Sequence, residues 1–117
     1  MTAGISIHAV DVAEGSPALG LRVEIFRQLP GPPVCLAQGT LGPMGTLDHP
    51  IVRGEGATLG SYEAHFHLGE WWRSRSGGAE RYFQEVAVFR FELIDPAQHY
   101  HLPIKFTQWG FALFRGA

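Results

Sequence analysis

Hydrophobic and polar residues alternate along much of the chain in runs of about six to eight residues. In the first run, Ile5, Ile7 and Ala9 share one face, and the residues between them share the other. The same period of two recurs at residues 21–26 and 61–68. Because successive side chains of a strand point to opposite sides, each run predicts a half-buried β-strand.

The rest of the chain continues this pattern with interruptions. We expect further strands at residues 35–40, 83–94, 98–106 and 108–114, a turn at 15–18, and a short edge strand at 50–53 within the irregular stretch 42–60. Residues 70–75 lack the period of two and predict one or two helical turns. Fifteen glycines and eight prolines leave little room for long helices. Several short strands with at most one short helix predict an all-β sandwich or barrel.

Composition and charge narrow the function classes. The 117 residues fit a single domain spanning 1–117, and nine basic residues against eleven acidic ones give a formal charge of −2. This balance gives no electrostatic reason to expect nucleic acid or a membrane surface as a partner. A lone Cys35 excludes an intrachain disulfide and suits a reducing compartment. Since no signal peptide or long apolar run is evident, we expect a cytoplasmic protein.

Three stretches carry a resemblance to a known family. The first is Ile-Ser-Ile-His-Ala-Val-Asp at 5–11, and the second is Phe-His-Leu-Gly-Glu-Trp-Trp at 66–72. The third contains His-Tyr-His-Leu-Pro at 99–103 and ends in Phe-Arg-Gly-Ala at 114–117. In this order and with little gapping, the chain resembles the transthyretin-like 5-hydroxyisourate hydrolases. The resemblance implies a transthyretin-like β-sandwich of two four-stranded sheets with one short helix, assembled as a homotetramer.

The resemblance also implies a reaction and a site. These enzymes of purine metabolism hydrolyse 5-hydroxyisourate, a cyclic amide formed in urate breakdown, by adding water without a metal or other cofactor. A histidine suits water attack on a carbonyl near neutral pH because it can act as a base there. By position in the family motifs, the implied catalytic residues are His8, His101 and Arg115. The implied substrate-binding residues are Thr46, Phe114, Gly116 and Ala117.

The chain departs from the family at groups that would stabilise charge. Thr46 stands where the family has Arg, and Phe114 and Ala117 replace its terminal Tyr and Ser. A guanidinium supplies two parallel charged donors, whereas a threonine supplies one neutral hydroxyl. Losing one oxyanion donor typically lowers a rate by about 10²–10³-fold. Arg53 is an alternative donor, although the intervening segment 50–52 should direct it elsewhere.

Other functions stay open at this level. The apolar residues Leu113, Phe114 and Ala117 favour a non-catalytic protein that binds a small apolar molecule, or a pseudoenzyme that only assembles with a partner. The retained His8 and His101 favour the diverged hydrolase. Two His-x-His pairs, at 65–67 and 99–101, place imidazoles on one side of a strand as zinc sites do. The resemblance nevertheless implies that no metal is needed.

Overall fold

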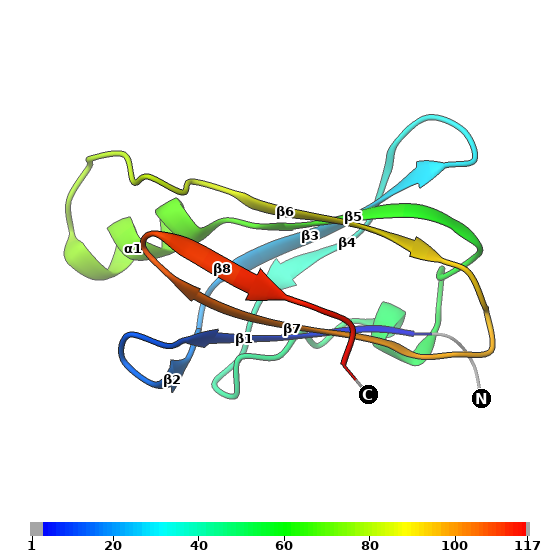
Figure 1. The fold of residues 1–117 in the computed structure, drawn as a ribbon, viewed down its shortest axis with the longest axis horizontal. Helices are drawn as coiled ribbons and strands as arrows, with labels where there is room; N and C mark the ends of the chain where they lie inside the picture. The colour runs from blue at the N-terminus through cyan, green and yellow to red at the C-terminus, as the bar shows by residue number, and fades with distance from the viewer. Residues whose placement is uncertain (1–3, 117) are drawn as a thin grey trace.

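The computed structural model describes residues 4–116, which form two four-stranded sheets packed face to face (Figure 1). One sheet has the strand order β2-β1-β7-β8, and the other has the order β4-β3-β5-β6. The strands are β1 Ile5–Asp11, β2 Ser16–Pro17, β3 Arg22–Leu29, β4 Val34–Thr40, β5 Gly60–Phe66, β6 Ala87–Leu93, β7 Tyr100–Thr107 and β8 Gly110–Leu113. One α-helix, α1, spans Leu68–Ser76. The predicted all-β sandwich of two four-stranded sheets with one short helix is confirmed.

The core lies between the inward faces of the two sheets. Every second residue of β1 and of β7 is buried, and the residues between them are more accessible. The largest fully buried side chains include Ile7, Ile25, Tyr62, Phe66 and Phe106. Burial of each such side chain contributes roughly 1.5–3 kcal/mol, so one residue of register slip would be costly. The period of two in the sequence therefore determines which side chains remain on the outward faces.

The first and seventh strands lie side by side although they are far apart in sequence. They are parallel, and their register pairs Ser6 with His101 and His8 with Pro103. Strand β8 runs antiparallel to β7 on its other side. Beyond β8, the Gly116 N–H donates to the His101 carbonyl at 2.7 Å. The segment after β8 is thus held against β7, on the side away from the first strand.

The segment 50–53 differs from its prediction. It forms a 3₁₀ helix, Pro50–Arg53, instead of an edge strand. The His49 side chain accepts a hydrogen bond from the Ile51 N–H, proline occupies the first turn, and Gly54 ends the helix in the left-handed region at φ 96°. The apolar Ile51 suggested a strand, but its side chain is buried in the core from the 3₁₀ helix.

Strand and helix ends also differ from the expected boundaries. Strand β6 begins at Ala87 rather than near residue 83 because Glu85 is engaged by the helix region. Its carboxylate accepts from Arg73 at 2.6 and 2.9 Å, and its carbonyl accepts from Gly69 N at 3.0 Å. The expected turn at 15–18 contains the two-residue strand β2. Helix α1 is one to two residues longer at each end than the predicted 70–75.

The loop after β4 returns to β1 through a close backbone approach. The Ala9 N–H donates to the Gly45 carbonyl at 2.9 Å. Gly45 has φ 74°, and a Cβ added there would lie 2.5 Å from the Ala9 carbonyl oxygen. Only glycine satisfies both conditions without strain. This approach fixes Thr46, the residue after Gly45, beside His8 of the first strand.

We predict that Gly45→Ala lowers the free energy of unfolding by about 3 kcal/mol or more, because it adds a backbone clash to left-handed strain. The matched control is Gly56→Ala, where φ is 87° but nothing lies within 4 Å of the added Cβ. We expect that variant to lose only about 1–2 kcal/mol. Urea unfolding at fixed protein concentration measures both, and equal losses would contradict the close approach at Gly45.

Candidate functional site

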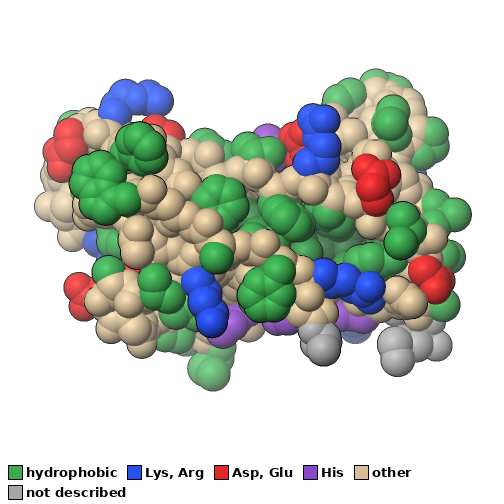
Figure 2. Space-filling model, viewed as in Figure 1, with side chains coloured by type: hydrophobic (Ala, Val, Ile, Leu, Met, Phe, Trp, Pro, Cys, Tyr) green, Lys and Arg blue, Asp and Glu red, His purple; other side chains and the backbone are tan. Residues whose placement is uncertain are grey.

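Polar side chains from three parts of the chain gather on the outward face of the β2-β1-β7-β8 sheet, and the backbone of a fourth part lies against them. Ser6 and His8 come from β1, and His101 comes from β7 with His99 directly before it. Thr46 and Gly116 flank this strand pair through isolated bridges, Thr46 to His8 and Gly116 to His101. Figure 2 shows histidine side chains along the lower edge of the molecule, where Figure 1 places β1 and β7. The expected juxtaposition of His8 and His101 in one sheet is therefore present in the structure.

Ser6 links two of the histidines. Its Oγ lies 2.8 Å from His99 Nε2 and 2.7 Å from His101 Nδ1. A hydroxyl can accept a hydrogen bond from one imidazole while it donates to the other. When His101 Nδ1 carries the proton and donates to Ser6 Oγ, its Nε2 keeps a lone pair. The arrangement is thus able to hold His101 as a base with a fixed ring orientation.

The surroundings of His101 favour its neutral form. Burial lowers the pKa of His101 below its ordinary value of 6.5, and the nearby His8 and His99 lower this pKa further by charge repulsion. A base whose pKa is lowered is mostly unprotonated at pH 7. His101 is therefore ready to accept a proton over the neutral range, and it loses that ability as the pH falls through its lowered pKa.

Two glycines let the flanking segments approach the histidines. A Cβ on Gly116 would lie 2.9 Å from His101 Cδ2 and 3.4 Å from Pro103 Cδ, so the backbone of the C-terminal segment lies directly against the imidazole. On the other side, Gly45 brings the exposed Thr46 beside His8. Two of the four predicted substrate-binding residues, Thr46 and Gly116, are consequently neighbours of His8 and His101, respectively.

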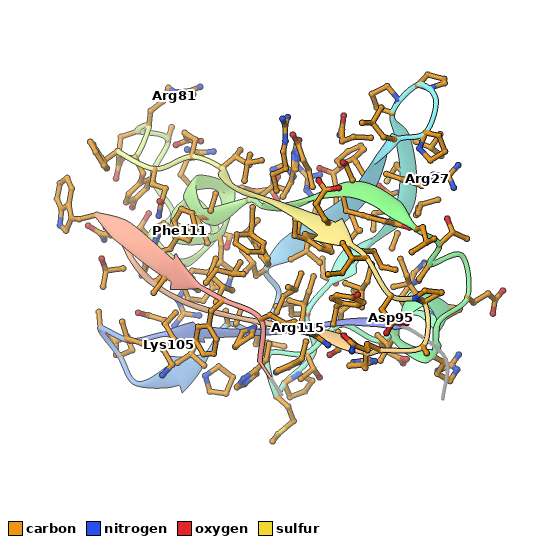
Figure 3. All side chains as sticks on the ribbon, turned by 45° about the vertical axis from the view of Figure 1, so that its right-hand side comes forward. Arg27, Arg81, Asp95, Lys105, Phe111 and Arg115 are labelled. Carbon is orange, nitrogen blue, oxygen red and sulfur yellow. The ribbon has the colours of Figure 1, made fainter. Side chains whose placement is uncertain are left out.

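Arg115 is engaged away from the imidazole rings. Its guanidinium donates to the His99 carbonyl at 2.9 Å and lies 4.4 Å from the centre of the Tyr100 ring. Tyr100 is buried and belongs to the opposite face of the strand from His101. Arg115 lies close to the lower sheet near the chain end (Figure 3). The structure thus does not show the expected convergence of this guanidinium with His8 and His101.

The remaining predicted site residues lie at the chain end and in the loop. Phe114 is 54% exposed and follows β8. Ala117 lies outside the described residues, so its predicted contact with substrate stays a prediction. Arg53, the alternative donor, ends the 3₁₀ helix, and its replacement of the missing loop arginine also stays a prediction.

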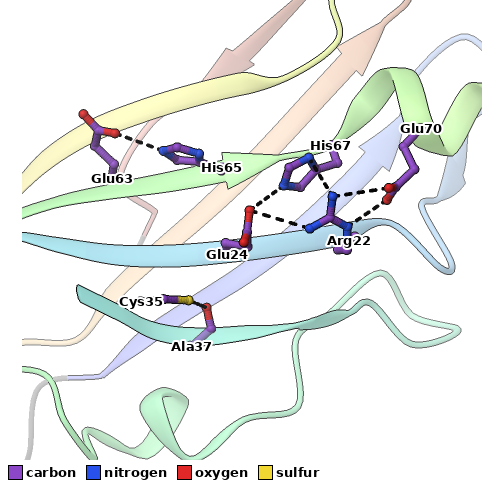
Figure 4. A network of polar contacts seen from close by, with 8 residues as sticks. All are labelled: Arg22, Glu24, Cys35, Ala37, Glu63, His65, His67 and Glu70. Carbon is purple, nitrogen blue, oxygen red and sulfur yellow. Dashed lines mark hydrogen bonds and ion pairs between the residues drawn. The ribbon is translucent and has the colours of Figure 1, made fainter. Parts of the chain in front are cut away.

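The His-x-His pair at 65–67 lies on the other sheet, where His65 is in β5 and His67 directly follows it, and takes part in different networks (Figure 4). His65 Nε2 lies 2.9 Å from Glu63, and His67 Nε2 lies 2.6 Å from Glu24. Arg22 contacts His67 Nδ1 at 3.2 Å, so both nitrogens of this ring have partners. Within residues 4–116, no three His, Cys, Asp or Glu side chains are grouped as metal ligands.

Sequence reasoning missed Ser6 and His99 as members of the cluster. Both share a strand face with a predicted catalytic residue, Ser6 with His8 and His99 with His101. That period-two relation was the available signal. The direct Ser6 contact to two rings depends on the parallel register of β1 and β7, which no local pattern specifies.

The chain matches a known protein family over nearly its whole length. The sequence profile of the HIUase/Transthyretin family matches residues 5–116. A protein of Deinococcus radiodurans named 5-hydroxyisourate hydrolase is 29% identical over 97% of this chain and 96% of its own length. The 5-hydroxyisourate hydrolase 2 of Rhizobium meliloti is 30% identical over 97% of this chain and 95% of its own.

Solved structures support the fold. An (S)-allantoin synthase matches with a TM-score of 0.88 and 26% identity, covering 99% of this chain and 44% of that one. Sea bream transthyretin in complex with thyroxine matches with a TM-score of 0.84 and 19% identity over 98% of this chain and 96% of its own.

Among the described residues, no helix is both long and apolar enough to cross a bilayer.

We predict that an NMR titration of His101 gives a midpoint below 6.5, because burial and like charges oppose protonation. His8→Gln should raise that midpoint towards the ordinary value, since it removes one of the repelling charges. His65→Gln, on the other sheet, should leave it unchanged. A midpoint above 6.5, or one insensitive to His8→Gln, would contradict the described electrostatics.

Proposed function

Because the chain belongs to the HIUase/Transthyretin family, we propose that it is a diverged hydrolase that opens a small urate-derived or related heterocycle, such as 5-hydroxyisourate, at the histidine cluster of the β1–β7 pair. The observation that carries this proposal is the contact of Ser6 Oγ with both His99 and His101 beside His8. The relatives named 5-hydroxyisourate hydrolase support the substrate class.

In the proposed reaction, His101 acts as the base. Its Nε2 takes a proton from water, and the water oxygen bonds to a ring carbonyl carbon. The carbon–nitrogen bond of the ring then breaks, and the proton passes from the imidazole to the departing nitrogen. Ser6 positions His101 through Nδ1, and its contact with His99 orients the hydroxyl. The lowered pKa of His101 suits this role near neutral pH.

Charge on the carbonyl oxygen needs donors. In this proposal His8 and Thr46, which face each other through a backbone bridge, supply them. Neither provides the paired charged donors of a guanidinium, so turnover should be slower than in relatives with arginine at this place. On the chain-end side, we propose that Phe114, Gly116 and Ala117 contact the substrate and that Arg115 holds this segment through its contacts with His99 and Tyr100. All of these roles fall to side chains and backbone, so the step requires no metal or cofactor.

A second candidate is non-catalytic binding of an apolar small molecule. The exposed Phe114, two residues before the Gly116 that contacts His101, favours it, because the family's tyrosine hydroxyl is missing. A binding protein would hold a urate-like ring without consuming it. Turnover assays separate the two candidates directly.

We further propose a cytoplasmic homotetramer. Strands β6 and β8 are the edges of their sheets on one side of the molecule (Figure 1), and hydrophobic side chains gather on the face that they share (Figure 2). On the two edge strands themselves, Val88 of β6 and Phe111 of β8 are exposed apolar residues. An unpaired apolar edge favours association with a second copy. The histidine cluster lies on an open sheet face, which stacked subunits would enclose.

For assembly, we predict a light-scattering mass near four times the 12.9 kDa of one chain. Val88→Lys should reduce that mass, because a charge on β6 opposes edge pairing. The matched control is Val34→Lys on the opposite edge strand, since Val34 is 41% exposed and Val88 is 46% exposed. A single-subunit mass for the unmodified protein would refute the tetramer.

For catalysis, we predict that His8→Ala and His101→Ala each lower turnover of fresh 5-hydroxyisourate by about tenfold or more without unfolding the protein. His65→Ala is the control, because its ring bonds to Glu63 on the other sheet. Circular dichroism verifies folding, and loss of substrate absorbance above spontaneous decay measures turnover. Normal activity in both cluster variants would place the reaction elsewhere.

For specificity, Thr46→Arg should raise turnover of 5-hydroxyisourate modestly, because it restores a charged donor beside His8. The gain stays modest since Phe114 and Ala117 still lack hydroxyls. Asp48→Arg, at an exposed position two residues further along the loop, is the control for the effect of added positive charge alone. An equal gain from Asp48→Arg would show that Thr46 does not stand at the donor position.

A further inference from the structure

A pocket lies at one end of the sandwich, where the end of β1, helix α1 and the turn between β7 and β8 come together. It has a volume of about 230 Å³ and is lined by Asp11, Ala13, Glu14, Trp72, Thr107, Gln108 and Trp109. These residues come from the end of β1 and its following loop, from α1, and from the turn between β7 and β8. Asp11 points to the face opposite His8, since the two are an odd number of residues apart on β1. The pocket is therefore separate from the histidine cluster.

Two buried polar atoms of this lining have no partner within the described part of the chain. Asp11 is fully buried, and its Oδ1 accepts from the N–H groups of Ala13 and Glu14 at 3.0 and 3.3 Å. Its Oδ2 and the Trp72 Nε1 are both buried without a hydrogen bond among residues 4–116. The neighbouring Trp71 differs, because its Nε1 donates to the Leu19 carbonyl at 2.9 Å. A buried carboxylate oxygen without a donor is costly, which points to a ligand that supplies one.

Charge and aromatic content define that ligand. The lining holds two acidic residues, Asp11 and Glu14, and none of its members is a Lys, Arg or His. The indole rings of Trp72 and Trp109 border the same space. Acidic groups beside aromatic faces favour a cation, which the rings attract through their π systems. A protonated primary amine also provides the N–H donor that Asp11 Oδ2 lacks, while the Trp72 indole N–H needs an acceptor oxygen.

We propose that this pocket binds a small primary alkylammonium ion that carries a hydroxyl oxygen. The ammonium group donates to Asp11 Oδ2 and lies against the indole rings. The hydroxyl oxygen accepts from Trp72 Nε1. Glu14 adds a second negative charge at the pocket. The site is independent of ring hydrolysis at the histidine cluster.

The test uses ethanolamine hydrochloride as the probe, titrated at pH 7 and constant ionic strength. The readout is the indole N–H resonance of Trp72 in ¹H–¹⁵N spectra of the whole protein, assigned with Trp72→Phe. We expect a saturable shift with a Kd in the millimolar range, as a ligand of about four heavy atoms allows. Ethylene glycol lacks the charge and propylammonium lacks the hydroxyl. We expect each of them to bind at least about tenfold more weakly than ethanolamine.

Asp11→Asn is the decisive variant because it keeps Oδ1 and the side-chain shape while removing the charge. We expect it to weaken ethanolamine binding at least tenfold. Asp48→Asn makes the same change in an exposed loop and should leave binding unchanged. Glu14→Gln, which leaves Asp11 intact, should weaken binding several-fold and serves as the second variant if Asp11→Asn fails to fold. No shift of Trp72 up to about 100 mM probe, or equal affinity for ethylene glycol, would overturn the proposal in favour of bridging water only.

Discussion

The parallel pairing of β1 with β7 is the constraint on which the rest of the site depends. It joins segments separated by about ninety residues and sets Ser6 opposite His101. The buried alternation in both strands fixes that register, because a slip of one residue would exchange the core for the outward face. This register brings the Ser6 hydroxyl within hydrogen-bond distance of His99 and His101. The packing of the core thus determines the chemistry of the outer face.

The same sheet serves different purposes on its two sides. Its inward face supplies Ile5, Ile7 and Leu102 to the core, and its outward face holds imidazoles whose protonation can change. Partial burial beside two other histidines lowers the pKa of His101, which favours a neutral base. Because the burial is only partial, one side of the histidine cluster is open to solvent. Enclosure by a second subunit would strengthen electrostatic interactions there and link catalysis to assembly.

Much of the fold was accessible from the sequence because period-two burial is a local signal. The alternation predicted β1, β3 and β5 closely. The 3₁₀ helix at Pro50–Arg53 was missed because Ile51 and Val52 are apolar for core contact, a tertiary cause that period alone does not reveal. His8, His101 and Thr46 were placed through family motifs, and the structure brings their segments together. The direction of the Arg115 side chain depends on its contact with Tyr100, which the motif does not encode.

In the proposed mechanism, Ser6 holds His101 as a neutral base with its proton on Nδ1. The most direct test is the ¹⁵N chemical shifts of the His101 ring at neutral pH, which report the protonation of each nitrogen separately. The account predicts a protonated Nδ1 and a bare Nε2 in the unmodified protein. In Ser6→Ala, it predicts a mixture of the two neutral tautomers. A ring protonated on Nε2, or one unchanged by Ser6→Ala, would contradict it.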